Sequence, residues 1–168
     1  MASVKKRRKG VVLELAPAEI ALLETLPAQL APVLEGGPTE GEGANPVRDR
    51  LFPQAYLDPT EEQAERNWQD MVHTDLVREK ATALATLATS LERVADSDRD
   101  AKLSLDREEV EAWLSALNDA RLALGVTLGI TEDHDAALLD PTDPASQPHF
   151  VYDWLTLLQG SILEVMFE

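Results

Sequence analysis

The sequence contains no cysteine among its 168 residues. This absence excludes disulfides, zinc–thiolate sites, iron–sulfur clusters and thiol nucleophiles, and it excludes redox sensing by thiols of this chain. Aromatic residues are also few, at 5% of the composition. The chain is nevertheless long enough to bury one domain core without support from disulfides or metal ions.

Long hydrophobic runs are missing as well. The apolar stretch that follows the basic start is interrupted by Glu14 and Glu19 and has no small-residue cleavage motif, which argues against a signal peptide. The apolar C-terminal segment contains Asp153 and Glu164, and it is shorter than the roughly 20 apolar residues of a membrane span. We therefore expect a cytoplasmic protein without a membrane segment.

Basic residues are scarce relative to acidic ones. The 15 lysines and arginines face 31 acidic residues, which gives a net charge of −16, and a third of the basic residues form the run from Lys5 to Lys9. An acidic body repels nucleic acid, so direct nucleic-acid binding is not expected. We interpret residues 1–9 as a solvated, disordered basic tail. The alternative, DNA binding through this tail, predicts an affinity that falls steeply with salt and disappears when residues 1–9 are deleted.

The hydrophobic spacing predicts four main helices. They are expected at residues 17–34, 60–95, 106–128 and from Pro148 to the C-terminus, with one short strand at Gly10–Leu15. A flexible linker at 35–45, an ordered loop pinned by the aromatic side chains of Phe52 and Tyr56, and an acidic loop at 131–147 are expected between them. The predicted fold is mainly α, a single four-helix bundle-like domain over residues 10–168 with at most one short N-terminal strand or hairpin.

The third helix has the clearest end signals. Asp106 followed three residues later by Glu109 is typical of a capping box. Gly129, with Ile130 after it, is typical of a Schellman cap, in which glycine adopts a left-handed conformation.

Signals for catalysis or cofactors are weak. The three histidines, His73, His134 and His149, lack the four-residue helical spacing of zinc enzymes, and the acidic cluster Glu132–Asp135 lacks the spacing of a calcium loop. The glycines near residues 36–43 do not lie between a strand and a helix, so they do not predict a phosphate-binding loop. We expect no cofactor, no metal site and no enzymatic activity.

One polar set lies inside an apolar helix. Arg121 falls on the same stripe as Leu117 and Leu124, so we expect it to point toward the core and to pair with a carboxylate such as Asp153 or Asp70. The set has two interpretations, a structural ion-pair network or a contact with a partner or ligand. In the second, Asn118, Asp119, Arg121 and Tyr152 surround a small anion. Gly125 in mid-helix indicates close packing or a hinge.

Three segments together resemble the actinobacterial AosR family. They are Arg50–Tyr56 (RLFPQAY), Trp113–Gly125 (WLSALNDARLALG) and Tyr152–Gln159 (YDWLTLLQ), and the resemblance covers residues 46–168. It implies a regulator of the oxidative-stress response that acts in transcription through other proteins, such as a sigma factor. Thiol sensing cannot be carried over to a chain without cysteine. Gln69 also departs from the family, whose members tend to have an arginine just after the aromatic residue near Trp68.

The sequence thus predicts a non-enzymatic, protein-binding regulator. Helices 106–128 and 149–167 are expected to form a homodimer or a partner interface, because the last helix is apolar on nearly every face. The three tryptophans, one in each long helix after residue 60, are expected to meet in the core. The candidate structural or partner-binding residues are Asn118, Asp119, Arg121, Gly125, Trp113, Tyr152, Trp154 and Gln159.

Overall fold

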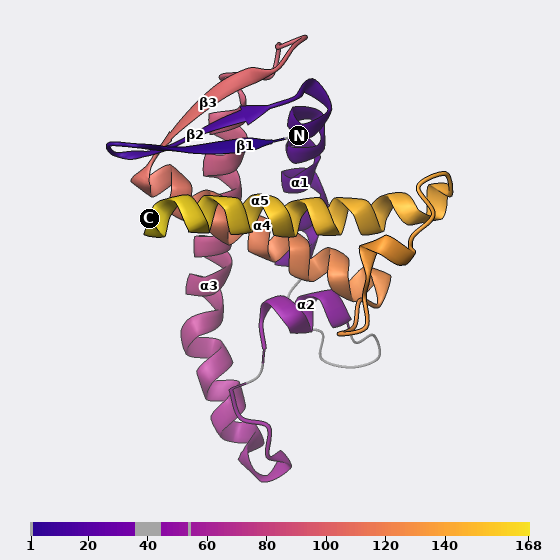
Figure 1. The fold of residues 1–168 in the computed structure, drawn as a ribbon. Coiled ribbons are helices and arrows are strands. Elements are labelled where there is room, and N and C mark those ends of the chain that lie inside the picture. The colour runs from indigo at the N-terminus through magenta and orange to yellow at the C-terminus, as the bar shows by residue number, and fades with distance from the viewer. Residues whose placement is uncertain (1, 36–44, 54) are drawn as a thin grey trace.

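A computed structural model describes residues 2–35, 45–53 and 55–168. In these ranges, helices and a three-stranded sheet follow one another along the chain (Figure 1). The strands are β1 (Ser3–Arg7), β2 (Gly10–Leu15) and β3 (Ala101–Asp106). The helices are α1 (Pro17–Glu35), α2 (Pro46–Leu51), α3 (Glu62–Leu91), α4 (Arg107–Leu128) and α5 (Gln147–Phe167), with short 3-10 turns η1 (Pro59–Glu61), η2 (Ala136–Leu138) and η3 (Pro144–Ser146).

The sheet is antiparallel, with β2 between β1 and β3. In the register of β2 with β3, Val11 faces Leu105 and Leu13 faces Leu103. All four of these side chains are buried, as expected when alternate residues of a strand point to the same side of a sheet. A shift of one residue would expose this apolar set, so the hydrophobic pattern fixes the register.

The expected four-helix bundle with at most one strand or hairpin is wrong, because the chain forms a mixed α/β fold with a three-stranded sheet. The expected disordered tail at residues 1–9 is wrong too, since Ser3–Arg7 is β1. Backbone hydrogen bonds to β2 order this strand whatever its side-chain charge, and Val4 packs against the core. The exposed basic side chains suit an edge strand, where charge discourages pairing with another chain. Of the expected linker at 35–45, residues 36–44 lie outside the described residues.

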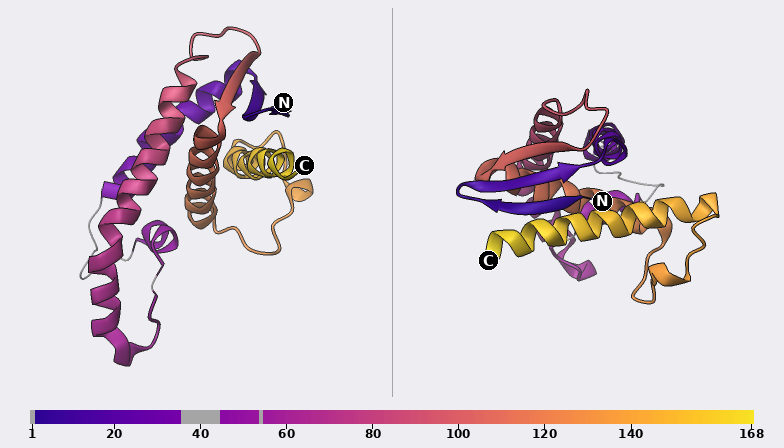
Figure 2. Two further views of the ribbon diagram at one scale, coloured as in Figure 1. Left: turned by 90° about the vertical axis from the view of Figure 1, so that its left-hand side faces the viewer. Right: turned by 45° about the horizontal axis from the view of Figure 1, so that its top comes forward.

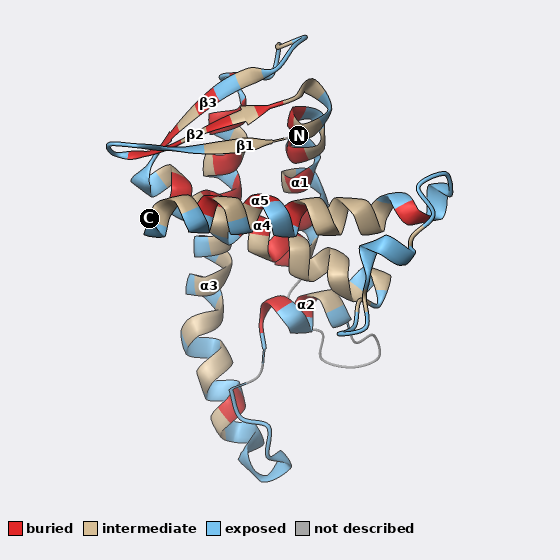
Figure 3. Cartoon of the chain, in the orientation of Figure 1, coloured by how far each residue is buried: buried red, intermediate tan, exposed pale blue. Residues whose placement is uncertain are grey.

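Two helical pairs surround the core below the sheet. α1 lies beside α3, and α4 lies beside α5, which also contacts β1 and β2 (Figure 2). The first half of α3 extends away from the rest of the molecule (Figure 1). Buried residues concentrate where the sheet, α4 and the second half of α3 meet (Figure 3). None of the helices in the described part of the chain is long and apolar enough to cross a membrane.

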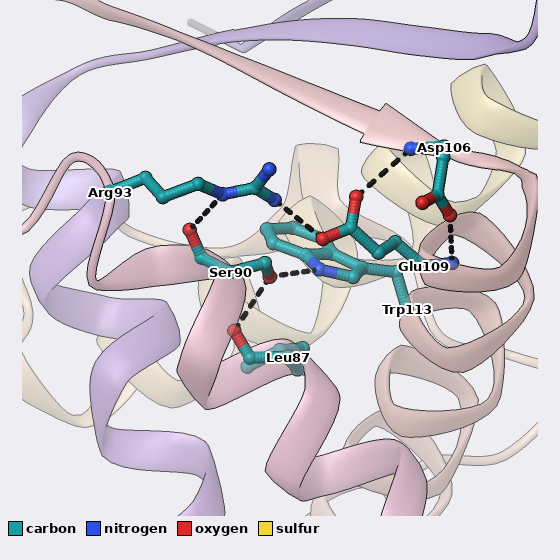
Figure 4. Close-up of polar contacts among 6 residues, drawn as sticks. All are labelled: Leu87, Ser90, Arg93, Asp106, Glu109 and Trp113. Atoms are coloured by element: carbon teal, nitrogen blue, oxygen red, sulfur yellow. Dashed lines mark hydrogen bonds and ion pairs between the residues drawn. The ribbon is translucent and has the colours of Figure 1, made fainter.

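The predicted ends of the third helix are confirmed. Asp106 and Glu109 form a reciprocal capping box at the start of α4 (Figure 4). At its end Gly129 is left-handed, with φ of 65°, and the N–H groups of Gly129 and Ile130 donate to the carbonyls of Val126 and Gly125. This is the bonding pattern of a Schellman cap. The segment Arg50–Tyr56 was expected to be a loop, but its first two residues, Arg50 and Leu51, belong to α2. This helix begins at Pro46, and the side chain of Asn45 caps it.

Trp113 anchors α4 to the end of α3. Its side chain is fully buried, and its Nε1 donates a 2.7 Å hydrogen bond to Oγ of Ser90, which in turn donates to the carbonyl of Leu87 (Figure 4). Nearby, Arg93 donates to the carbonyl of Ser90 and forms a 2.8 Å ion pair with Glu109. Glu109, which takes part in the capping box of α4, therefore also connects α4 to Arg93, just after the end of α3.

Gly10 is required by the close approach of β2 to β3. Its φ is 151°, and a Cβ at this position would collide with the backbone oxygen of Leu105. We expect Gly10→Ala to lower the free energy of unfolding by about 2 kcal/mol, measured by urea denaturation. Gly160→Ala is the matched control, because no atom lies within 4 Å of an added Cβ there and α5 should gain up to about 1 kcal/mol in helix propensity. Equal stability of the two variants would contradict the strain assigned to Gly10.

Candidate functional site

A cavity of about 350 Å³ lies where the three segments of the family resemblance meet. Arg50 comes from the end of α2, Arg121 and Gly125 from α4, and Tyr152 from α5. The remaining lining is mainly apolar, and it consists of Leu122, Val126, Gly129, Ile130 and Thr131. We call this cavity the arginine pocket.

Gly125 lets the ring of Tyr152 approach α4. A Cβ at Gly125 would lie 3.1 Å from Cε2 of Tyr152, which is closer than side chains normally tolerate without movement. The glycine in mid-helix therefore has close packing against α5 as its physical reason. The aromatic ring in turn forms one wall of the arginine pocket.

Arg121 has no carboxylate partner among the described residues, so the expected pairing with Asp153 or Asp70 is wrong. Its Nη2 donates a 3.2 Å hydrogen bond to Oδ1 of Asn118, and its Nε is buried without a partner. Asp153 is instead bonded to His134, and Asp70 is exposed on α3. The side chain is half-buried, so its guanidinium lies at the wall of the pocket rather than deep in the core.

Asp119 faces away from the arginine pocket toward α3. Its side chain is only 4% exposed, and Oδ1 lies 2.8 Å from Nζ of Lys80. Burial raises the pKa of Asp119, while the hydrogen bond and positive charge of Lys80 oppose that rise. Asn118 thus accepts a hydrogen bond from Arg121, whereas the adjacent Asp119 pairs with Lys80. The sequence alone did not indicate Lys80 as the partner of Asp119.

A second polar cluster ties the acidic loop to α5. Nε2 of His134 lies 2.8 Å from Oδ1 of Asp153, and the His134 ring stacks on His149 with 5.9 Å between centroids. The same imidazole contacts Tyr152 edge-on at 5.7 Å, so this cluster supports the back of the pocket wall. The described residues contain no group of three or more His, Asp or Glu side chains that could hold a metal ion.

Arg48, a buried arginine that was not singled out from the sequence, connects α2 to α1 and α3. Arg48 is 6% exposed, donates a 2.8 Å hydrogen bond to the carbonyl of Val33, and lies 2.8 Å from Nε2 of His73. Burial and the adjacent positive charge both lower the pKa of His73. The Arg48 guanidinium also lies 5.1 Å from the ring centroid of Phe52, which is buried, whereas Tyr56 is 40% exposed. Phe52 thus pins this segment, and Tyr56 does not.

The remaining candidates are spread over the fold. Trp113 lies in the core, and Nε1 of Trp154 donates a 3.0 Å hydrogen bond to Glu19. Trp68 lies on α3 outside the core cluster, so the expectation that the three tryptophans meet is wrong. Gln159 is half-buried on α5.

A further cavity, of about 460 Å³, is lined by α1, α2, α4 and α5 and has a different character. None of its described lining residues is charged, and most are aliphatic, such as Leu26, Leu30 and Leu124. Of the two, only the arginine pocket offers groups that recognise charge.

The sequence is similar to a known protein family and to several bacterial proteins. The model of a family described as a domain of unknown function (DUF2017) matches residues 1–166. The chain is 29% identical to the putative oxidative stress regulator AosR of Mycobacterium leprae, over 86% of this chain and 76% of that protein. It is 40% identical to the oxidative stress regulator AosR of Mycobacterium tuberculosis H37Rv and of Mycobacterium bovis over 70 residues, which are 41% of this chain and 31% of theirs. No solved structure matches.

Proposed function

This chain belongs to the DUF2017 family and is similar to the AosR proteins of mycobacteria, and on that premise we propose that it is a non-enzymatic regulator of the oxidative-stress response. We propose that it acts by binding another protein of the transcription machinery, such as a sigma factor. The names of the relatives support the regulatory role, and the outer surface of α5 supports action through a partner.

The observation that carries this proposal is an exposed apolar stripe on α5. Leu157 is 55% exposed, Leu163 36% and Phe167 87%. Gly160 lies on the same exposed side, and an added Cβ there would meet no atom within 4 Å. α5 crosses the outer face of the molecule, so this side of the helix is open to a partner (Figure 1). Leu163 and Phe167 are neighbours at i and i+4, and Leu157 lies six positions before Leu163. Exposed apolar side chains that gather on one side of a helix are typical of a surface that another protein covers.

The charges around the stripe favour one kind of partner. α5 contains no lysine or arginine, and Glu164 and Glu168 lie beside the stripe in a chain of net charge −16. The basic side chains of the β1–β2 turn lie near Met166 of α5, but a second copy of the chain has the same net charge of −16 and would be repelled overall. An apolar surface rimmed by lysine and arginine would be attracted. We therefore propose a basic-rimmed partner protein rather than a homodimer.

The absence of cysteine constrains how such a regulator receives its signal. The chain cannot form a disulfide or a sulfenic acid, so an oxidant cannot act on it through a thiol. The signal must reach it through its partner, through another side chain, or through a bound ligand.

Affinity capture from the native host, with and without peroxide, tests this proposal. We expect the tagged chain to recover a sigma factor or polymerase subunit. The double variant Leu157→Glu/Phe167→Glu should lose at least about 90% of it, because each charge would be buried in an apolar interface. Leu138→Glu is the control, since Leu138 is 82% exposed in the acidic loop, which is joined to α5 near Asp153 and does not belong to the apolar stripe.

Two outcomes would contradict the proposal. Unchanged recovery in the double variant would remove the α5 stripe from the interface. Recovery of nothing but the chain itself would point to a homo-oligomer, which light scattering of the purified protein would show directly.

A further inference from the structure

We propose that the arginine pocket binds a small organic anion, with a carboxylate or phosphate group at Arg50 and Arg121 and an apolar part against Tyr152 and α4. The proposal goes beyond the regulatory function argued above, because it concerns a ligand of the isolated chain. It rests on the charge of the lining, the donors of Arg121 that have no partner among the described residues, and the apolar wall.

The charge of the lining is opposite to that of the chain. Acidic residues outnumber basic ones by about two to one in the sequence, yet the described lining contains two arginines and no aspartate or glutamate. Neither Arg50 nor Arg121 forms an ion pair within the described ranges. Because both arginines line the same cavity, an anion bound there can interact with both positive charges.

Most donors of Arg121 have no partner among the described residues. A guanidinium has five N–H donors, and only the 3.2 Å bond to Asn118 engages this one among the described residues. The planar arrangement of these donors matches two oxygens of a carboxylate or phosphate. The Nε is buried and has no partner among the described residues, so the protein satisfies the guanidinium only in part.

The rest of the lining favours an organic anion over a bare inorganic one. Leu122, Val126 and Ile130 contribute aliphatic side chains to the lining, and Tyr152 contributes an aromatic one. Gly125 and His134 fix that ring from two sides, so the wall is preformed. The volume of about 350 Å³ lies near the lower end of the range for small-molecule sites, roughly 300–1,000 Å³.

One feature of the pocket opposes an anion. The last turn of α4 lies beside it, and the C-terminal end of a helix carries partial negative charge. The Schellman cap reduces this effect, because the carbonyls of Gly125 and Val126 already accept hydrogen bonds from Ile130 and Gly129. Two full positive charges therefore outweigh what remains of a partial negative one.

The test uses the purified full chain and four probes: acetate, benzoate, inorganic phosphate and phenyl phosphate. NMR signals of the arginine Nε–H groups and of the Tyr152 ring report binding. We expect benzoate or phenyl phosphate to shift Arg121 and Tyr152 with saturation, and to bind about tenfold or more tightly than acetate or inorganic phosphate.

Variants locate the site. Arg50→Gln changes an exposed side chain and should fold normally, and we expect it to weaken binding about tenfold, as should Arg121→Gln. Arg78→Gln is the matched control, because Arg78 is 73% exposed on α3 and should leave the affinity unchanged.

Either of two results would overturn the proposal. One is the absence of saturable binding by all four probes, and the other is an unchanged affinity in both Arg50→Gln and Arg121→Gln. If inorganic phosphate binds as tightly as phenyl phosphate, the organic part of the proposal is wrong. Because these measurements need no partner protein, their failure is distinguishable from failure of the proposed regulatory function.

Discussion

Trp113→Ala is expected to lower the free energy of unfolding by about 4 kcal/mol. The Trp113 side chain is fully buried between the sheet and the helices, so its removal leaves a cavity that rigid neighbours fill only in part. The substitution also removes the hydrogen bond from Nε1 to Ser90. Urea denaturation followed by far-UV circular dichroism measures the effect without depending on tryptophan fluorescence.

Ser90→Ala separates the hydrogen bond from the packing. It keeps the indole in place but leaves its buried N–H without an acceptor, which should cost about 1–3 kcal/mol. Trp68→Ala serves as the tryptophan control, because Trp68 is half-buried on α3 outside the core cluster and should cost less. A loss below about 1 kcal/mol for Trp113→Ala would contradict the central place of this side chain in the core.

Local signals in the sequence were sufficient for the long helices. The capping box at Asp106 and the glycine at 129 act within a few residues, so the pattern that specifies each end can be recognised without the rest of the fold. The same applies to α1 and α5, whose apolar residues recur at helical spacing over 19 and 21 residues. A short helix such as α2 offers too few turns for spacing to be visible.

The sheet could not be predicted in this way. β3 has the alternating pattern of Leu103 and Leu105, but its partner β2 lies about ninety residues earlier in the chain. The charged side chains at Lys5, Lys6 and Arg7 also remove the hydrophobic pattern that would indicate a strand at β1. This edge strand is held by backbone hydrogen bonds rather than by side-chain burial. Pairing between distant segments is not encoded in any local window of sequence.

Several residues of the candidate site could be identified from the sequence, but their tertiary contacts could not. Arg121, Gly125 and Tyr152 were singled out from the sequence, and the fold brings them to one pocket. The contribution of Arg50 to that pocket, and the pairing of Lys80 with Asp119 across two helices, depend on tertiary contacts. The sequence thus indicated which polar residues needed partners, but it did not indicate which partners they have.

Lys80→Met is expected to lower the free energy of unfolding by about 3 kcal/mol at neutral pH, because it leaves the carboxylate of Asp119 buried without its counter-ion. The reverse change, Asp119→Asn, should cost less. The Lys80 side chain is 18% exposed, against 4% for Asp119, so its ammonium group can still reach water. Urea denaturation of both variants gives the comparison.

The pH dependence of Lys80→Met follows from the direction of the pKa shift. Burial raises the pKa of Asp119 in the folded protein above its ordinary value, so the folded state favours the protonated carboxyl. The stability associated with that proton is present at low pH and is lost as the pH rises through the raised pKa. Without Lys80 the pKa of Asp119 rises further, so the variant should regain stability relative to the parent on acidification.

The double variant Lys80→Met/Asp119→Leu decides between two accounts of this ion pair. If the cost of Lys80→Met comes from a stranded charge, replacing both partners with apolar side chains should restore stability to within about 1 kcal/mol of the parent and abolish the extra pH dependence. If the double variant is as unstable as Lys80→Met, the lysine instead contributes through its own packing, including its position 5.8 Å from the ring centroid of Phe52. In the first case the ion pair determines the relative position of α3 and α4 but adds little to the free energy of unfolding. A buried carboxylate is tolerated only in an arrangement that places its counter-ion within hydrogen-bonding distance.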